Sequence, residues 1–420
     1  GPGMKLSDDR FAGAERLLTA DEALELLDQR IAPVTTSEAL PLRQTRGRVL
    51  AADVVSAHDV PPHDNSAVDG YAFAFADLEP VGETRLAIAG RSAAGHAPEG
   101  AGGEGRAVRI FTGAMMAPGC DTVAMQEDCR RQGDEVMVPA GLRAGANRRL
   151  TGENIHHDDV ILQAGQRLRP QDIGLAASVG RSHLDVHRPL RAAIFSTGDE
   201  IREPGDDLGP AAIFDANRYL LMGLLDGLGV ALTDLGILPD RLGEVRRALA
   251  TAARDHDLLI TSGGVSVGDE DHVRVAVEEL GKLHFWKLAI KPGRPLALGQ
   301  VGEVPFIGLP GNPVAAMVTF LRFARPVILR LGGCSNIDPA LFRVTADFDY
   351  KKKSERREYL RARLARLADG SLVVRPFEPS GSGILRSMVE ADGLVELPEE
   401  MSELQAGSTV DFLPFNEVGS

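Results

Sequence analysis

The sequence predicts a multidomain α/β protein with a parallel α/β layer-sandwich core, an inserted small β domain and a C-terminal β-barrel. Three observations predict this class. Short β-rich runs and glycine-rich turns interrupt a helical N-terminal region between residues 58 and 145. From Leu190 onward strands alternate with helices, which is the pattern of a parallel sheet covered by helices. After Gly332 and Gly333 the sequence is again rich in short strands.

The N-terminal region begins with a helix signal. Thr19 and Glu22 form a capping box, which predicts a helix of about 12 residues from Ala20. Segment 40–52 is expected to hold a short helix or an extended piece, and Pro61-Pro62 ends any helix there. The remaining predicted elements of this half are strands at 85–88, 108–111, 122–126 and 135–138, and a helix around 172–179.

The second half predicts the core and the barrel. Core strands are expected at 191–195, 230–238 and 257–261, with helices at 215–226, 243–255 and 270–280. A β pair at 285–290 and 305–309 precedes a last helix at 313–330, and barrel strands are expected at 343–348, 361–367, 371–376 and 409–413. The predicted domains are 15–57 with 146–188, 58–145, 189–335 and 336–420.

Composition and charge exclude several classes of protein. Lys and Arg total 46 against 60 Asp and Glu, and the net charge of −14 argues against a nucleic-acid-binding coat. No apolar run approaches the roughly 18 residues that span a bilayer, and no secretory signal is visible. Cys120, Cys129 and Cys334 lack zinc-like spacing and suit a reducing compartment. We therefore expect a cytoplasmic protein whose partners are neither nucleic acid nor membrane.

A glycine-rich loop follows the third core strand. Ser262, Gly263, Gly264 and Ser266 lie between this strand and the next helix. Glycines let backbone N–H groups approach an anion, and a helix N-terminus adds partial positive charge. The loop therefore predicts a phosphate-binding cradle, while a tight strand-to-helix turn with nothing bound is the alternative. It is not a Walker A motif, because no Gly-Lys-Ser/Thr follows.

Carboxylates follow each of the first three core strands. Because carboxyl ends of parallel strands meet at one edge, these side chains are expected to share a rim. Several carboxylates on one rim repel each other unless they share a cation, and hard oxygen ligands suit Mg²⁺. Helix capping is the alternative for any single residue. The residues in question are Asp199, Glu200, Asp240, Asp269 and Asp271.

A basic run and a rigid loop complete the candidates in the core. Lys287, Lys291 and Arg294 lie within a few residues, and the intervening Pro-Gly turn is expected to bring the last two together. In an acidic protein such a cluster focuses an anion site, although a solvated basic edge is equally consistent. Pro310 and Pro313 lie in Gly-Leu-Pro-Gly-Asn-Pro, a stiff turn entering a helix that is suited to fixing the shape of a pocket.

Several motifs occur together in a fixed order. They are DNSAVDGYA (64–72), RIFTGAMMAPGCDTVAMQED (109–128), STGDE (196–200), SGGVSVGDED (262–271), FWKLAIKPGRP (285–295) and GLPGNP (308–313). In this order they resemble the molybdopterin molybdenumtransferases, the MoeA family, which includes the E domain of gephyrin. The resemblance runs from about residue 15 to the end of the chain. It implies a molybdopterin-binding-like core and an elongated N-terminal domain.

The resemblance also implies a reaction. Members of the family take adenylylated molybdopterin and molybdate, insert the metal at the dithiolene and release AMP, assisted by Mg²⁺. They are homodimers whose active site lies between protomers. Molybdate and tungstate are tetrahedral oxyanions of nearly equal size, so the sequence favours neither.

The family's site residues carry over onto matching positions. Asp69 and Thr112 match polar positions of the small β domain that face the partner's cleft. Glu200, Asp240 and Asp271 match acidic cleft residues, and Pro310 and Pro313 match the rigid loop. Lys291 and Arg294 match a basic pair with a plausible oxyanion role, to which the C-terminal domain adds Arg356 and Ser382.

Two positions depart from the family pattern. Asn154 stands where an aspartate is usual, so a negative charge is absent, and Ala315 stands where a serine is frequent, so a hydroxyl donor is absent. Two other functions share parts of the pattern. A non-catalytic scaffold of the gephyrin type requires an exposed peptide groove. A molybdopterin adenylyltransferase shares the Ser-Gly-Gly α/β core but lacks the inserted β domain and the C-terminal barrel.

Overall fold

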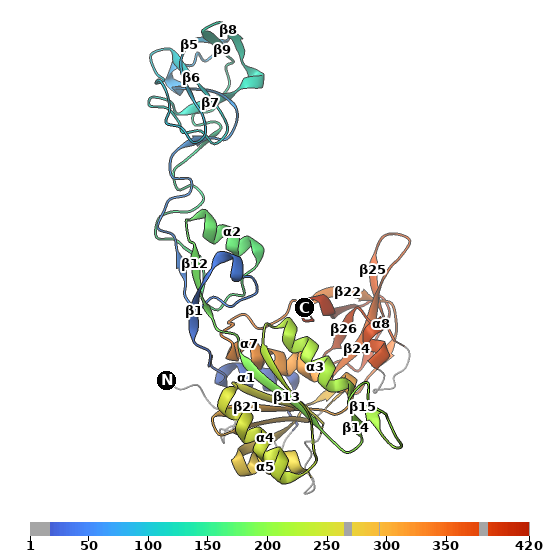
Figure 1. Ribbon diagram of the computed structural model, residues 1–420. Helices are drawn as coiled ribbons and strands as arrows, with labels where there is room; N and C mark the ends of the chain where they lie inside the picture. Colours follow the sequence, from blue (N-terminus) through green and yellow to red (C-terminus); the bar gives the residue numbers. More distant parts are fainter. Residues whose placement is uncertain (1–16, 264–270, 294, 378–384, 420) are drawn as a thin grey trace.

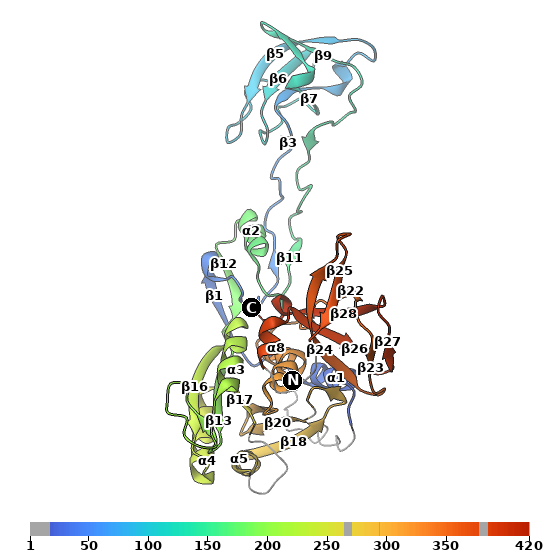
Figure 2. The same cartoon turned by 90° about the vertical axis from the view of Figure 1, so that its right-hand side faces the viewer.

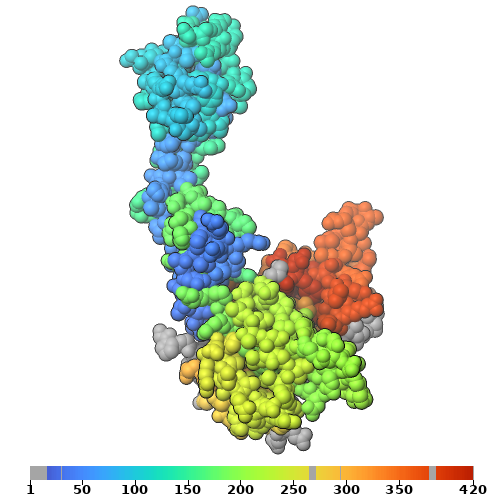
Figure 3. All heavy atoms as spheres, viewed as in Figure 1, coloured from blue at the N-terminus to red at the C-terminus, as the bar shows by residue number. Residues whose placement is uncertain are grey.

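The computed structural model describes residues 17–263, 271–293, 295–377 and 385–419. The chain is elongated, with an α/β core and a β-barrel at one end and a small β domain at the other (Figures 1 and 2). A narrow stalk joins the two ends, as the space-filling view shows (Figure 3).

The first helix packs on the α/β core. Helix α1, Ala20–Arg30, begins as its capping box predicts, because Thr19 Oγ1 accepts the backbone N–H of Glu22 at 3.1 Å. Leu27 and Ile31 are buried in the same hydrophobic cluster as residues of the central sheet. Burial of this apolar stripe fixes the start of the chain against helix α7, Arg325–Leu331.

Two passes of the chain form the stalk. The ascending and descending passes pair as short antiparallel strands at successive heights (Figure 2). The segment 40–52, expected as a short helix or an extended piece, contains the end of a strand and a short 3-10 turn. Helix α2, Pro170–Ser178, confirms the helix expected around 172–179. The strand pairs are β1 (Ser37–Pro41) with β12 (His183–His187), β2 (Val54–Val55) with β11 (Val160–Leu162), and β3 (Asn65–Ser66) with β10 (Arg148–Arg149).

The small β domain at the tip is a mixed sheet. Its strand order is β7-β4-β6-β5-β9-β8, and Phe73, Leu86 and Val136 fill its core. The four strands expected from the sequence are confirmed. Strand β8 and strand β4, which lies in the polar motif after Asp69, were not predicted. The strands are β4 (Gly70–Phe73), β5 (Thr84–Ser92), β6 (Arg106–Ile110), β7 (Thr122–Met125), β8 (Arg130–Gln132) and β9 (Glu135–Val138).

The central sheet has the order β16-β13-β17-β21-β20-β18. Strands β16, β13 and β17 are parallel, as expected. Strand β21 runs parallel beside β17, and β20 and β18 add an antiparallel edge. The predicted pairing of 285–290 with 305–309 is wrong, because β20 lies between these segments. The strands are β13 (Arg191–Thr197), β16 (Ala231–Leu238), β17 (Leu258–Ser262), β18 (Gly281–Lys287), β20 (Pro295–Val301) and β21 (Val304–Leu309).

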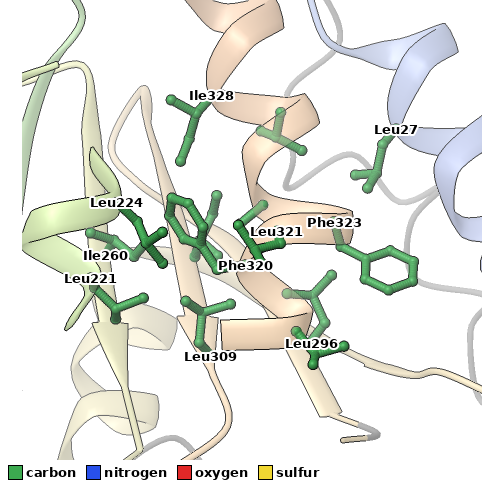
Figure 4. Close-up of a cluster of buried hydrophobic side chains, with 14 of the residues drawn as sticks. Leu27, Leu221, Leu224, Ile260, Leu296, Leu309, Phe320, Leu321, Phe323 and Ile328 are labelled. Atoms are coloured by element: carbon green, nitrogen blue, oxygen red, sulfur yellow. The ribbon is translucent and has the colours of Figure 1, made fainter. Parts of the chain in front are cut away.

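Helices cover both faces of this sheet, so its strands are apolar on both sides. In β13, Ile194 packs with the α3 side and Phe195 with the opposite side. One layer holds α3 (Ala216–Gly227), α6 (Pro313–Thr319) and α7, with a π-helical turn at Phe320–Ala324 between the last two. The other layer holds α4 (Leu242–Asp255) and α5 (His272–Leu280). Figure 4 shows Leu221, Ile260, Leu309 and Phe320 within the hydrophobic cluster between the sheet and the layer of α3, α6 and α7.

The C-terminal strands close into a barrel, as expected. Their order is β24-β25-β22-β28-β26, and β26 pairs again with β24. Strand β19, Ile290–Lys291, runs parallel to the start of β24 and so connects the core to the barrel. Strand β26 was not predicted. The barrel strands are β22 (Phe342–Ala346), β24 (Arg357–Arg366), β25 (Leu372–Pro376), β26 (Gly393–Leu397) and β28 (Thr409–Pro414), with helix α8 at Leu385–Glu390.

Candidate functional site

The carboxyl ends of the parallel strands meet at one edge of the central sheet. Thr197 pairs in register with Leu238, and Ser262 with Leu309, so the loops that follow these strands begin at the same level. The loop residues expected from the sequence therefore start from one rim.

The loop after β13 carries Asp199 and Glu200, both exposed. A Cβ atom on Gly198, whose φ is 139°, would lie 2.8 Å from Glu200 Oε2, so the glycine makes room for that carboxylate. The guanidinium of Arg202 donates to the Asp199 carbonyl at 2.5 Å. The backbone N–H of Ile213 donates to the Glu200 carbonyl at 2.7 Å. Backbone contacts thus fix the loop while both carboxylates remain open to solvent.

Asp240 and Asp271 lie in neighbouring loops. Asp271 is the N-cap of α5 and accepts the backbone N–H of Arg274 at 3.0 Å, so the capping alternative holds for this residue. The next residue, His272, contacts Asp240 Oδ1 through Nδ1 at 2.8 Å. This contact joins the loop after β16 to the start of α5. Asp269 lies outside the described residues.

The acidic rim has the donor chemistry for Mg²⁺ but does not form a complete ligand set by itself. In the described part of the chain, no three metal-ligating side chains gather closely enough to hold an ion. Asp240 is engaged by His272, and Asp271 caps a helix. Mg²⁺ commonly keeps several waters and takes one or two protein carboxylates together with substrate phosphates, so an ion at this rim would take its remaining ligands from water and substrate.

The described start of the glycine-rich loop, Ser262 and Gly263, lies beside the rigid loop. The Gly263 N–H donates to the Leu309 carbonyl at 2.9 Å, and a Cβ on Gly263 would come 3.4 Å from the Cα of Gly311. Asn217 at the start of α3 donates to the Gly311 carbonyl at 2.7 Å. Ser262 and Pro310 are buried and Pro313 is half-buried, while Gly264 and Ser266 lie outside the described residues.

Asn312 explains how the rigid loop enters its helix. Its side-chain oxygen accepts the N–H groups of Val314 and Ala315 at 3.0 and 3.1 Å. Pro313 occupies the first helical turn, as the sequence predicts. The side chain of Ala315 faces Gly293, in the turn after Lys291. A Cβ atom on Gly293 would lie 3.4 Å from the Cβ of Ala315 and 3.1 Å from Thr319 Oγ1.

Two of the predicted basic residues meet at a carboxylate that the sequence did not reveal. Lys291 Nζ lies 3.7 Å and Arg356 Nη2 lies 3.5 Å from Glu358 Oε1. Lys287 is exposed at the end of β18, and no contact within the described residues joins it to this pair. Arg294 and Ser382 lie outside the described residues. No sequence signal pointed to Glu358, which lies before the strand expected at 361–367 and inside the longer observed strand β24.

Asp69 and Thr112 form a pair at the tip of the molecule. Asp69 Oδ1 accepts the Thr112 N–H at 2.8 Å and its hydroxyl at 3.0 Å, and these hydrogen bonds hold the pKa of Asp69 below its usual value. Thr112 is exposed and Asp69 is half-buried. The stalk separates the small β domain from the core, so one chain does not bring this pair to the acidic rim (Figures 1 and 3). Asn154 lies in the stalk, where its backbone N–H donates to Val60.

Comparison with known proteins accounts for this arrangement along nearly the whole chain. Residues 18–180 match the MoeA N-terminal region (domain I and II), residues 193–330 match the probable molybdopterin binding domain, and residues 343–415 match the MoeA C-terminal region (domain IV). The chain belongs to the MoeA family. This membership confirms the family resemblance and the predicted fold class.

Individual relatives of the MoeA family agree. The molybdopterin molybdenumtransferase of Haemophilus influenzae is 37% identical over 96% of this chain and 100% of its own length. Its Nostoc counterpart is 34% identical over 89% of this chain and 88% of its own length. The crystal structure of the molybdopterin biosynthesis moeA protein from Pyrococcus horikoshii OT3 aligns with a TM-score of 0.80 and 28% identity, covering 94% of this chain and 99% of that one. Among the described helices, none has the length and apolarity needed to cross a membrane.

Proposed function

We propose that this MoeA family member is a molybdopterin molybdenumtransferase, an enzyme of molybdenum cofactor biosynthesis. It takes adenylylated molybdopterin and molybdate, inserts the metal at the dithiolene and releases AMP. The observation that carries the proposal is the 37% identity to a molybdopterin molybdenumtransferase over its entire length. A separate adenylyltransferase is not favoured, because all three family regions match in order. A non-catalytic scaffold is not favoured, because the relatives that match over most of the chain are named as the enzyme.

The geometry of the core supports this reaction. Gly263 and Gly311 lie next to each other and carry no Cβ atoms, which leaves room for a nucleotide phosphate beside the two loops. Lys291 and Arg356 lie together at the junction with the barrel and supply positive charge for molybdate. In this proposal catalysis is mainly positioning and charge stabilisation.

We also propose Mg²⁺ as the cofactor. Glu200, Asp240, Asp269 and Asp271 would supply carboxylate oxygens, and the phosphates of the substrate would complete the ligands. Bound there, Mg²⁺ would polarise the phosphoanhydride. The protein's own contribution is to hold Asp240 and Asp271 in adjacent loops through the His272 contact.

A homodimer with the active site between protomers is part of the proposal. The Asp69–Thr112 pair, in which Thr112 is exposed and Asp69 half-buried, lies at the end of a stalk and is remote from the acidic rim of its own chain (Figure 2). A second copy is therefore needed to bring the two sets of residues together. The proposed domain boundaries are 15–57 with 146–188, 58–145, 189–335 and 336–420.

A cytoplasmic location is proposed from the cysteines. All three are free thiols, and burial raises the pKa of Cys120 and of Cys129 to about 11. Thiols of this kind are inert and persist in a reducing compartment.

Release of AMP tests the proposal. The purified chain is mixed with adenylylated molybdopterin, Mg²⁺ and molybdate, and AMP is measured by chromatography. We expect release that depends on molybdate. Absence of AMP release by a folded chain would favour the scaffold, and consumption of ATP with molybdopterin alone would favour the adenylyltransferase.

A further inference from the structure

Glu358 is a buried carboxylate between the two basic residues at the junction of core and barrel. Its side chain is 1% exposed, against 55% for Lys291 and 21% for Arg356. Lys291 and Glu358 are direct partners in the β19–β24 register, so the backbone itself sets them opposite each other. Both cations approach the same oxygen, Oε1.

The position of Glu358 within β24 gives it an unusual environment. Its register partner is Leu397, and it lies on the face of β24 that also carries Leu360 and Ala362 toward the interior of the barrel. The hydroxyl of Tyr350 donates to Oε1 at 3.3 Å. The second oxygen, Oε2, is buried and accepts no hydrogen bond from a described residue. A carboxylate in this state depends on its two cations for compensation.

A groove opens beside this cluster. It has a volume of about 560 Å³, and its lining includes Lys291, Pro292, Phe348 and Tyr350 as well as Glu358. An oxyanion that enters the groove and reaches Lys291 meets a cation that already contacts a fixed negative charge.

We propose that Glu358 is an internal competitor for the oxyanion substrate. It holds Lys291 and Arg356 side by side before the substrate arrives, and its charge weakens the binding of a doubly charged oxyanion at those cations. The inference rests on the proposed function, because it takes molybdate as the oxyanion. A substrate that must be transferred gains nothing from very tight binding in the ground state, so a built-in competitor favours turnover.

Glu358 has two opposing effects on oxyanion binding, and the larger one decides whether removing its charge tightens or weakens that binding. Holding a lysine in place saves some side-chain entropy on binding. A fixed negative charge a few ångströms from a dianion in a partly buried site opposes binding more strongly, because it acts on both charges at an effective dielectric well below that of water. Removing the charge of Glu358 is therefore expected to tighten oxyanion binding.

Calorimetric titration of the full chain with sodium molybdate, and separately with sodium sulfate, tests this competition. We expect Glu358→Gln and Glu358→Ala to lower the dissociation constants at least about fivefold, whereas Glu358→Asp, which keeps the charge, stays within about twofold. In a Lys291→Met background the gain should shrink, because the cation that Glu358 competes for is gone. Glu396→Gln is the matched control. Glu396 lies on the neighbouring strand β26 and is equally buried between two arginines, Arg322 and Arg357. It is the register partner of Tyr359, so it lies on the face of the sheet opposite to that of Glu358.

The outcomes separate this inference from the proposed function. If wild-type protein releases AMP but the neutral variants bind molybdate no more tightly than wild type, the function stands and the competition is overturned. If AMP is not released but sulfate binding tightens in the neutral variants, the competition stands and the function fails. If neither neutral variant melts cooperatively, Glu358 is a structural brace, and the competition is overturned as well.

Discussion

The acidic rim of the core and the Asp69–Thr112 pair at the tip are built in opposite ways. At the rim, residues from four strand ends are tied together within one chain by contacts such as His272 to Asp240 and Asn217 to Gly311. At the tip, Asp69 and Thr112 contact each other and stand apart from the rest of the candidate site. Folding of one chain thus assembles one half of the proposed site, and in the proposed dimer the other half comes from the second chain.

Asp271→Asn is expected to have the largest effect. Asparagine is as good an N-cap as aspartate, so α5 and the fold should remain intact. Loss of the negative charge at the rim should lower kcat for AMP release at least about 100-fold. Thermal melting checks the fold, and Asp21→Asn in the first turn of α1 is the control. Near-normal turnover of Asp271→Asn would show that the residue only caps its helix.

Mixing two inactive variants tests the difference between rim and tip directly. Asp69→Asn and Asp271→Asn should each be nearly inactive alone. When the chains are mixed and allowed to exchange, half of the dimers pair an intact tip with an intact rim at one of two sites. About a quarter of the wild-type activity should therefore return. No recovery, with subunit exchange verified by native mass spectrometry, would contradict a site that is shared between protomers.

Asn217→Ala should have a smaller effect, confined to the core. It removes the hydrogen bond to the Gly311 carbonyl and loosens the rigid loop. We expect KM for adenylylated molybdopterin to rise about two- to tenfold with kcat little changed. Asn336→Ala, at an exposed position beyond the last core helix, serves as control. Steady-state kinetics measures both, and an unchanged KM would mean that the loop keeps its shape without this tie.

Thr112→Val should have the smallest effect, seen in the pH dependence. The Thr112 hydrogen bonds lower the pKa of Asp69, so the stabilisation they provide is present at neutral pH and is lost as pH falls through the folded-state pKa. Valine removes the hydroxyl but keeps the backbone N–H, so the pKa of Asp69 should rise and the acid limb of kcat/KM should move to higher pH. Carboxyl NMR titration measures the pKa.

Thr151→Val is the matched control for that pH measurement. The Thr151 hydroxyl donates to Asp64 in the same manner, at 2.8 Å, but in the stalk. It should shift the pKa of Asp64 and leave the activity profile unchanged. An equal shift of the acid limb in both variants would mean that the limb does not report Asp69.

Much of the fold was predictable because local and tertiary preferences agree. The capping box at Thr19, the apolar run of β13 and the Asn312-Pro313 helix start each gave the observed element. Strand β20 was missed because it begins with a proline directly after a basic turn, which reads as a loop. Strand β26 was missed because it is short and its pairing with β24 and β28 is long-range.

The sequence indicated which residues belong to the candidate site more readily than how those residues are arranged in space. Strand ends in a parallel sheet must share an edge, so the acidic rim followed from spacing. The capping role of Asp271 was one of two alternatives, and periodicity did not choose between them. Glu358 was missed because its importance depends on Lys291, some 67 positions earlier, lying opposite it across β19 and β24. Such a pairing is set by the closure of the barrel onto the core.

The stalk makes the small β domain at the tip a structural unit that is separate from the core. Ser66 and Arg148 are partners in the β3–β10 ladder, so the chain leaves the stalk for the small β domain and returns to it at the same place. The hydrophobic clusters of the tip contain no residue from the central sheet. We therefore expect that a β domain from a relative can replace the residues between these two positions without disturbing the packing of the core. The residues that the small β domain contributes to the proposed site can then be exchanged separately from those of the core.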